Sequence, residues 1–230
     1  MQILLLGDSW SVPNYRNKEA DPKETHSEFL LTNLGHTVHN CGMNGGSNIT
    51  SLDRAKEYLK GGVIGHPAHL PNQVMQLTSL VKIDLVIWFH TEPYRDIALI
   101  TTENKTIDQQ LHEICSIIYQ EYKDFLDSLN AKIAVIGGCS DIYDTLYEYI
   151  TPDFCWPSWQ KKLLGIGSMG FNISSGTTPT ENDIQLLDNS LKVIQAMIES
   201  SYFSDGAHPG KQAHKELVKA LSEKFNLIPE

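Results

Sequence analysis

The stretch Gln2-Ile3-Leu4-Leu5-Leu6-Gly7-Asp8-Ser9 opens the chain and decides its expected fold. Its first five residues are mostly apolar and a glycine stops them, which is typical of a strand buried on both faces of a parallel sheet. A serine directly after such a strand lies at the carboxyl edge of the sheet, where open α/β folds build their sites. A serine hydroxyl is a weak nucleophile by itself, so a catalytic Ser9 needs a base and a carboxylate from elsewhere in the chain.

The composition is that of an ordinary globular protein. The chain has 230 residues, of which 41% are hydrophobic and 20% charged. This length suits one α/β domain, so we expect residues 1–230 to form a single domain. The net charge is −10 and the 18 Lys and Arg residues form no dense run. A nucleic-acid binder normally carries a basic stripe, so nucleic acid is not an expected partner.

Targeting and redox signals are weak. No apolar run approaches the roughly 18 residues that a membrane helix requires, and the sequence opens without a basic n-region or a cleavage site. The four cysteines are scattered and show no C-x-x-C pairing. We therefore expect a reduced, cytoplasmic protein without a membrane span, although export by another route and the oligomeric state stay open.

Strand-like and helix-like segments alternate along the chain. After the opening strand, we expect strands at residues 36–40, 84–89 and 132–138, and a short fifth strand near Tyr149. The expected helices are residues 27–34, 49–59, 72–81, 107–129, 141–150, 181–200 and 211–225. This alternation predicts a three-layer α/β domain with a mainly parallel sheet. Residues 151–180 are expected to form an elaborated connection near the mouth of the site.

The motif Asp205-Gly206-Ala207-His208-Pro209-Gly210, before the last expected helix, supplies the missing base and carboxylate. Asp205 and His208 are three residues apart, so their side chains can meet in a turn. The carboxylate could then hold one imidazole nitrogen while the other nitrogen accepts the Ser9 proton. Taken alone, the motif favours an ordinary turn before a helix, with Asp205 bonding local backbone amides.

Together, Gly7-Asp8-Ser9 and Asp205-x-x-His208 resemble the SGNH (GDSL-like) hydrolases, a superfamily named for a Ser, a Gly, an Asn and a His in four separated blocks. The resemblance extends over essentially the whole chain in the order and spacing of the blocks. It implies a flavodoxin-like α/β/α domain with a catalytic triad of Ser9, His208 and Asp205. It also implies hydrolysis of esters or thioesters through an acyl-serine intermediate, with no metal and no organic cofactor.

The second block of the family usually has the pattern N-x-x-x-x-G. Asn40-Cys41-Gly42-Met43-Asn44-Gly45 fits this pattern, so the resemblance implies that Gly45 is the oxyanion glycine. A glycine lets a backbone N–H approach a developing oxyanion without a side chain in the way. The alternative is a glycine turn between a strand and a helix, without a catalytic role.

The third block departs from the family pattern G-x-N-D. A gapless alignment places His90 at the glycine, Glu92 at the oxyanion asparagine and Pro93 at the aspartate. An ionised Glu cannot donate a hydrogen bond, and loss of one oxyanion donor commonly lowers turnover by about 10²–10³. Three alternatives remain: a protonated Glu92, a Glu92 paired with Arg95 that leaves donation to Thr91, His90 or backbone amides, or a site that binds without catalysis.

The expected function is serine-dependent hydrolysis of carboxylic esters, with the Ser9 and Gly45 amides holding the oxyanion. By family analogy the substrate is a small-molecule or glycan-linked ester, first of all a short acyl group on a carbohydrate. Two alternatives stay open. One is a non-catalytic binding or structural module on the same fold, and the other is an acyltransferase that uses the same triad.

The remaining candidates are weaker. The histidines show no ligand spacing with a carboxylate partner, so no metal site is expected. Trp10 is expected to pack at the floor of the pocket. Trp156, Trp159 and Phe171 are either a platform for sugar or acyl groups or the small core of the 151–180 segment.

Overall fold

The centre of the fold is a five-stranded sheet with the strand order β2-β1-β5-β6-β7. The computed structural model describes residues 1–12, 26–67, 73–138, 141–165, 191–192, 194–200, 202–203 and 208–228. The sheet strands are β1 (Gln2–Leu6), β2 (Thr37–Asn40), β5 (Leu85–His90), β6 (Lys132–Gly137) and β7 (Phe154–Trp156). All four neighbouring pairs are parallel. This is the flavodoxin-like doubly wound order.

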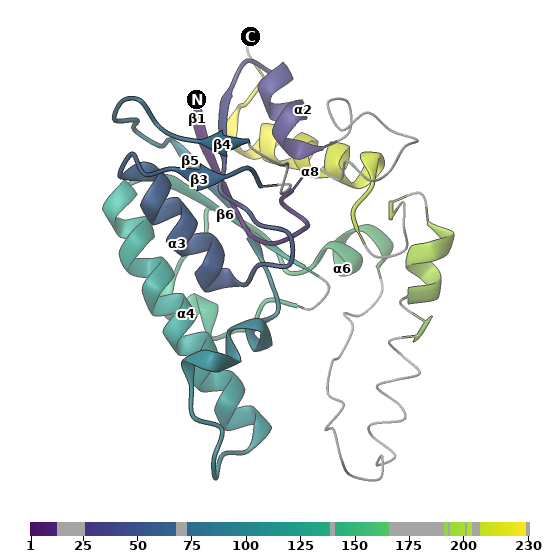
Figure 1. Ribbon diagram of the computed structural model, residues 1–230. Coiled ribbons are helices and arrows are strands. Elements are labelled where there is room, and N and C mark those ends of the chain that lie inside the picture. Colours follow the sequence, from purple (N-terminus) through teal and green to yellow (C-terminus); the bar gives the residue numbers. More distant parts are fainter. Residues whose placement is uncertain are drawn as a thin grey trace.

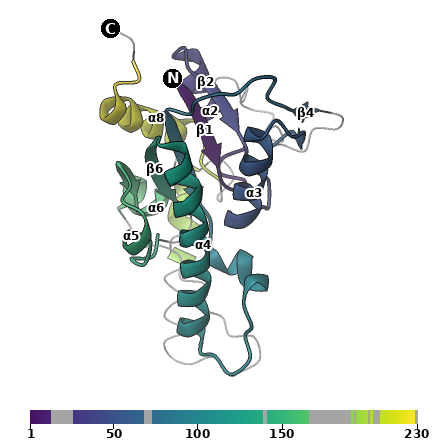
Figure 2. The same ribbon diagram turned by 90° about the vertical axis from the view of Figure 1, so that its left-hand side faces the viewer.

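Helices cover both faces of the sheet, which makes three layers (Figures 1 and 2). The helices are α2 (Ser27–Asn33), α3 (Asn48–Leu59), α4 (Ile107–Leu129), α5 (Leu146–Tyr149), α6 (Trp159–Leu164) and α8 (Lys211–Phe225), with a 3₁₀ segment η1 (Pro93–Leu99). The core under α2, α6 and α8 is separate from the core under α3, α4 and α5. The predicted three-layer α/β fold with a mainly parallel sheet is therefore confirmed.

Burial on both faces explains the continuous apolar runs of the central strands. In β1, Ile3 and Leu5 face the α8 layer, whereas Leu4 and Leu6 face the α4 layer, and all four are fully buried. A strand with one face in water would alternate apolar and polar residues instead. The apolar run of β1 thus encodes its central position in the sheet.

Gly7 lets the chain leave β1 close to the end of β5. Its φ is +139°, and a Cβ added there would lie 2.6 Å from both the Cβ and the carbonyl oxygen of Phe89. Only glycine fits such a close approach in this conformation. The Gly7 N–H donates to Ser51 Oγ at 2.6 Å, which ties the exit from β1 to α3.

Most of the predicted elements are confirmed. The strands predicted at residues 36–40, 84–89 and 132–138 correspond to β2, β5 and β6, and the helices predicted at 27–34, 49–59, 107–129 and 211–225 correspond to α2, α3, α4 and α8. Of the helix predicted at 181–200, residues 191–192 and 194–199 are helical and residues 181–190 lie outside the described residues. Residues 166–180 of the predicted elaborated connection also lie outside them, and the single domain over 1–230 stays a prediction.

Three predictions about elements are wrong. Residues 73–81 form no helix; they contain β4 (Val74–Met75), which pairs antiparallel with β3 (Ile64–Gly65). Thr78, Ser79 and Val81 are weak helix formers in a segment too short to stabilise itself. The helix predicted at 141–150 shrinks to α5. The fifth strand is β7, not a strand near Tyr149, because Tyr149 ends α5.

Within the described parts of the chain, no helix combines the length and the hydropathy that a membrane crossing requires.

Candidate active site

The ends of β1, β5 and β6 lie together at the carboxyl edge of the sheet. Gly7 after β1 lies against Phe89 of β5. A Cβ added to Gly138, the residue after β6, would lie 3.1 Å from the carbonyl oxygen of His90 and 3.7 Å from Glu92 Oε1. The predicted first and third blocks therefore meet at one edge, where doubly wound folds place their ligands.

Ser9 and His208 come together from opposite ends of the chain. His208 Nε2 lies 3.1 Å from Ser9 Oγ, although the two residues are 199 positions apart. With Nε2 unprotonated, the Ser9 hydroxyl donates to it, which is the geometry a general base needs. Both side chains are half-buried. Asp205, the predicted carboxylate of the triad, lies outside the described residues.

The residues that follow His208 are fixed by backbone pairing. Phe203 and Pro209 form an antiparallel bridge, and the Gly210 N–H donates to the Tyr202 carbonyl oxygen at 2.7 Å. Gly210 then caps α8 at its N-terminus. The start of α8 therefore sets the place from which His208 reaches Ser9.

A tight turn presents Ser9 above a buried tryptophan. Asp8 Oδ1 accepts from the Trp10 N–H at 3.0 Å, and the Ser11 N–H donates to the Asp8 carbonyl oxygen at 3.0 Å. Trp10 is buried, and its ring centroid lies 6.0 Å from that of Trp159 and 6.1 Å from that of Phe203. Trp10 therefore packs beneath residues 8–11, which carry the predicted nucleophile Ser9 and are called the nucleophile turn below.

The alternative of an aromatic platform is not supported for the two tryptophans of the 151–180 segment. Trp156 and Trp159 are 4% and 0% exposed and belong to the α8-side core. Their rings meet edge to face, with centroids 5.6 Å apart. Both are core residues, and Phe171 lies outside the described residues.

Asn40 joins the second block to the nucleophile turn. Its Nδ2 donates to the Ser11 carbonyl oxygen at 2.7 Å and to Glu28 Oε2 at 2.8 Å. Its Oδ1 accepts from the Gly42 N–H at 3.0 Å. Burial raises the pKa of the Glu28 carboxyl, against the hydrogen bond from Asn40. The sequence reasoning had used Asn40 only as part of a spacing pattern and had missed Glu28.

Gly45 lies at the open side of residues 42–46, which are called the glycine turn below. Its φ is +68°, and a Cβ added there would meet no atom within 4 Å. The Met43 N–H donates to the Gly7 carbonyl oxygen at 2.9 Å, so the glycine turn is bound directly to the exit from β1. Gly45 is therefore exposed beside the nucleophile turn, with open space where a side chain would lie.

Glu92 is paired with Arg95, as in the second of the three alternatives for the third block. Arg95 Nε lies 3.1 Å from Glu92 Oε2, and Arg95 Nη2 lies 3.5 Å from Asp8 Oδ2. Arg95 Nη1 also donates to the Gly46 carbonyl oxygen at 3.4 Å, and Thr91 Oγ1 donates to Glu92 Oε2 at 3.2 Å. One guanidinium thus contacts the nucleophile turn, the glycine turn and the end of β5.

Asp8 is the most buried carboxylate of this cluster. Burial raises the pKa of the Asp8 carboxyl; the Trp10 N–H and the Arg95 guanidinium oppose the shift, whereas Glu92 adds to it. Because Asp8 holds the turn through Trp10 and faces Arg95, it has a structural part beside Ser9.

His90 was predicted among the possible oxyanion donors, and the structure places it elsewhere. The ring is 2% exposed and lies in the core on the α4 side. His90 Nε2 lies 3.0 Å from the Tyr119 hydroxyl oxygen, and the ring centroid lies 5.1 Å from that of Trp88. Side chains two apart on a strand share a face, so His90 points where Trp88 points. His90 is therefore a core residue, and the prediction of a donor role is corrected.

Asn48, at the start of α3, is a buried polar residue that the sequence reasoning missed. It is 0% exposed, and its side chain contacts Trp88 and Thr91 of the β5 end. Asp96 is also buried and accepts from the Asn48 and Ile49 N–H groups. The only local signal was the serine before it, a normal helix cap.

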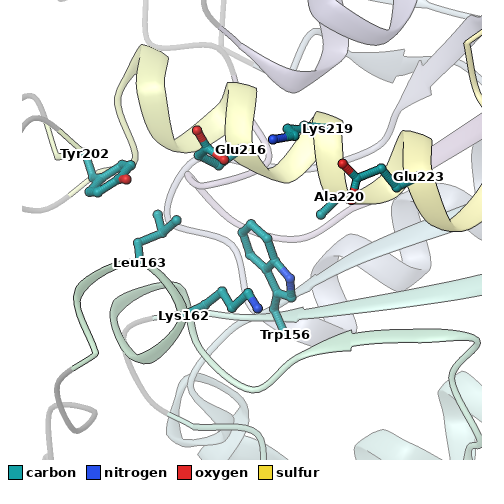
Figure 3. A pocket seen from close by; sticks show the side chains of 8 residues that line it. All are labelled: Trp156, Lys162, Leu163, Tyr202, Glu216, Lys219, Ala220 and Glu223. Atoms are coloured by element: carbon teal, nitrogen blue, oxygen red, sulfur yellow. The ribbon is translucent and has the colours of Figure 1, made fainter.

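Across the residues that the structure describes, no group of three or more His, Cys, Asp or Glu side chains could hold a metal ion. A cavity of about 270 Å³ lies between α8 and α6, and neither Ser9 nor His208 is among the residues that line it (Figure 3). Its lining consists of Trp156, Lys162, Leu163, Tyr202, Glu216, Lys219, Ala220 and Glu223.

Comparison with known proteins gives structural neighbours only. No protein-family model and no curated protein sequence matches the chain. Among solved structures, the psychrotrophic esterase EstA from Pseudoalteromonas sp. is 12% identical with a TM-score of 0.45, over 98% of this chain and 96% of that chain. A carbohydrate esterase is 13% identical with a TM-score of 0.45, over 99% of this chain and 66% of that chain. AlinE4, an SGNH-hydrolase family esterase, is 13% identical with a TM-score of 0.40, over 86% of this chain and 97% of that chain.

The core placement of His90 makes a prediction about acid stability. Burial lowers the pKa of His90 to about 3, from an ordinary value of 6.5. The unfolded chain therefore binds a proton that the folded chain does not, and stability is lost as the pH falls below 6.5. His90→Gln should remove this contribution, so that the free energy of unfolding falls less steeply between pH 6 and 4, by about 1.4 kcal/mol per pH unit.

Urea unfolding at several pH values measures this slope. His112→Gln, which changes an exposed histidine of α4, controls for the loss of a histidine as such. A His90→Gln slope equal to that of the unmodified protein would show that His90 is not a buried neutral group.

Proposed function

We propose that this protein is an SGNH-type hydrolase that cleaves carboxylic esters through an acyl group on Ser9. The observation that carries the proposal is the approach of His208 Nε2 to Ser9 Oγ, 3.1 Å, at the carboxyl edge of a doubly wound sheet. A serine and a histidine within hydrogen-bond reach at this edge form the nucleophile and base of acyl-transfer sites.

The reaction proceeds in two halves. Ser9 Oγ attacks the ester carbonyl carbon while its proton passes to His208 Nε2. The imidazolium returns that proton to the leaving alcohol oxygen as the carbon–oxygen bond breaks, which leaves the acyl group on Ser9. Water then loses a proton to His208 and attacks the acyl carbon. The bond between the acyl carbon and Ser9 Oγ breaks as His208 returns the proton to Ser9 Oγ, and the carboxylic acid leaves. In this scheme Asp205 orients the imidazole through Nδ1.

Backbone groups take most of the charge that develops on the carbonyl oxygen. In the proposal the N–H groups of Ser9 and Gly45 bind the oxyanion, and the open space at Gly45 supports this assignment. In this proposal Glu92 takes the place of the family's third donor, as the alignment of the third block predicts. Arg95 offsets the charge of Glu92 at 3.1 Å, so the oxyanion forms beside an ion pair instead of an isolated carboxylate.

Glu92 also favours a second function, a non-catalytic binding module on the same fold. A protein whose site lacks the amide donor can still bind a ligand in the pocket without hydrolysing it.

Acyl transfer to an alcohol would use the same residues as hydrolysis, and products formed with competing acceptors distinguish these two reactions. A short acyl group on a carbohydrate remains the first substrate to test.

Labelling with a fluorophosphonate tests the proposed nucleophile. The reagent phosphonylates an activated serine and loses fluoride, so the purified protein should gain one adduct on Ser9 within minutes. Ser9→Ala should gain none, and His208→Ala should react at least about 10²-fold more slowly, because the base is lost. Equal labelling of Ser9→Ala, or no labelling of the unmodified protein, would favour the binding module.

Glu92→Gln tests how the proposed site stabilises the negative charge on the substrate carbonyl oxygen. The change keeps the length of the side chain, removes a negative charge and adds an amide donor, so kcat for p-nitrophenyl acetate should rise about tenfold or more. Glu113→Gln is the matched control. Glu113, like Glu92, belongs to an ion pair, but its partner is Lys105 and it lies on α4. An unchanged kcat with an unchanged pH profile would remove Glu92 from any part in charge stabilisation.

A further inference from the structure

We propose that Asn48 is a positioning residue for this reaction, whose side-chain amide holds the end of β5 against the start of α3 and so fixes Gly45 and Glu92 relative to each other. The inference rests on the proposed ester hydrolysis and adds to it a residue that the nucleophile, base and oxyanion groups do not include.

The Asn48 amide pairs with the backbone of Thr91 as a neighbouring strand would. Asn48 Oδ1 accepts from the Thr91 N–H at 3.1 Å, and Asn48 Nδ2 donates to the Thr91 carbonyl oxygen at 3.0 Å. β5 ends at His90, so Thr91 has left the sheet ladder. The amide therefore supplies both backbone partners that the ladder no longer gives to Thr91.

Three further contacts fix the orientation of Asn48. Trp88 Nε1 donates to Asn48 Oδ1 at 3.2 Å, which identifies that atom as the oxygen. The Asn48 N–H donates to Asp96 Oδ2 at 3.2 Å, and the Asn48 carbonyl oxygen accepts from the Tyr122 hydroxyl at 2.9 Å. The residue is fully buried, so each of these groups would be costly to leave unpaired.

Asn48 lies between the two parts of the site that must cooperate. It follows the glycine turn, three residues after Gly45, and directly follows Ser47, the N-cap of α3. Through Thr91 it is bound to the residue before Glu92. A shift of the Asn48 amide would therefore move the proposed oxyanion glycine relative to the end of β5, and small misplacements of catalytic groups can lower rates by about 10².

Asparagine is the side chain that these contacts require. The amide presents an acceptor and a donor side by side, as a peptide group does. An ionised aspartate keeps the acceptor but places a second oxygen against the Thr91 carbonyl oxygen. Alanine removes both contacts and leaves Trp88 and Thr91 with unpaired buried groups.

Asn48→Asp is the sharpest test, because it changes one donor and almost no volume. With p-nitrophenyl acetate, kcat should fall about 10–100-fold at pH 8, while KM stays within about threefold. Fluorophosphonate labelling should slow by a similar factor, since it also needs the oxyanion donors. As the pH falls, the introduced carboxyl becomes protonated and can donate to Thr91 again. The ratio of the variant rate to the unmodified rate should therefore rise.

Asn33→Asp is the matched control, because it makes the same change at an exposed asparagine at the end of α2. It should keep kcat within about threefold. If Asn48→Asp does not fold, Trp88→Phe releases the amide oxygen from one side, and kcat should fall with KM nearly constant.

The outcomes separate the two proposals. A folded Asn48→Asp that reacts like Asn33→Asp, or that loses activity without recovery at low pH, overturns the positioning role while the unmodified protein still labels at Ser9. An unmodified protein that does not label overturns ester hydrolysis and this inference together.

Discussion

The structure depends on the position of β1 in the middle of a parallel sheet. β1 pairs with β2 on one side and with β5 on the other, and its register places Leu6 opposite Trp88. Because both faces are covered by helices, the strand can hold this place only with an uninterrupted apolar run. Gly7 then releases the chain at the level of Phe89, where any side chain would collide with β5. Ser9 is thereby delivered to the same edge as Glu92 and Gly45.

The two halves of the proposed site differ in how they are held. The nucleophile and base are brought together by the start of α8 and by the turn over Trp10, both of which rest on the α8-side core. The charge-stabilising half is held by polar contacts: Arg95 contacts three loops, and Asn48 contacts Thr91. Arg95 pairs with the Glu92 carboxylate, and Asn48 binds the backbone of the preceding residue, Thr91.

Local pattern was enough to predict the parts of the fold that are locally determined. The apolar runs predicted β1 and β5, and the helical spacing of apolar residues predicted α4 and α8. The motifs around Ser9 and His208 predicted that these two residues, from opposite ends of the chain, lie together. The prediction that His90 could be an oxyanion donor was wrong because a gapless alignment does not indicate toward which face of the strand a side chain points. Its spacing of two from Trp88 would have placed it in the core. Asn48 could not be found, since its partners Thr91 and Tyr122 are 43 and 74 residues away.

The most direct test of the account is to isolate the acyl-enzyme. The protein is mixed with p-nitrophenyl acetate, quenched in acid within the first turnover, and mapped by peptide mass spectrometry. The account predicts a burst of nitrophenolate and an acetyl group on the peptide that contains Ser9, both absent in Ser9→Ala. An acetyl group carried only by other side chains, or hydrolysis that persists in Ser9→Ala, would contradict it.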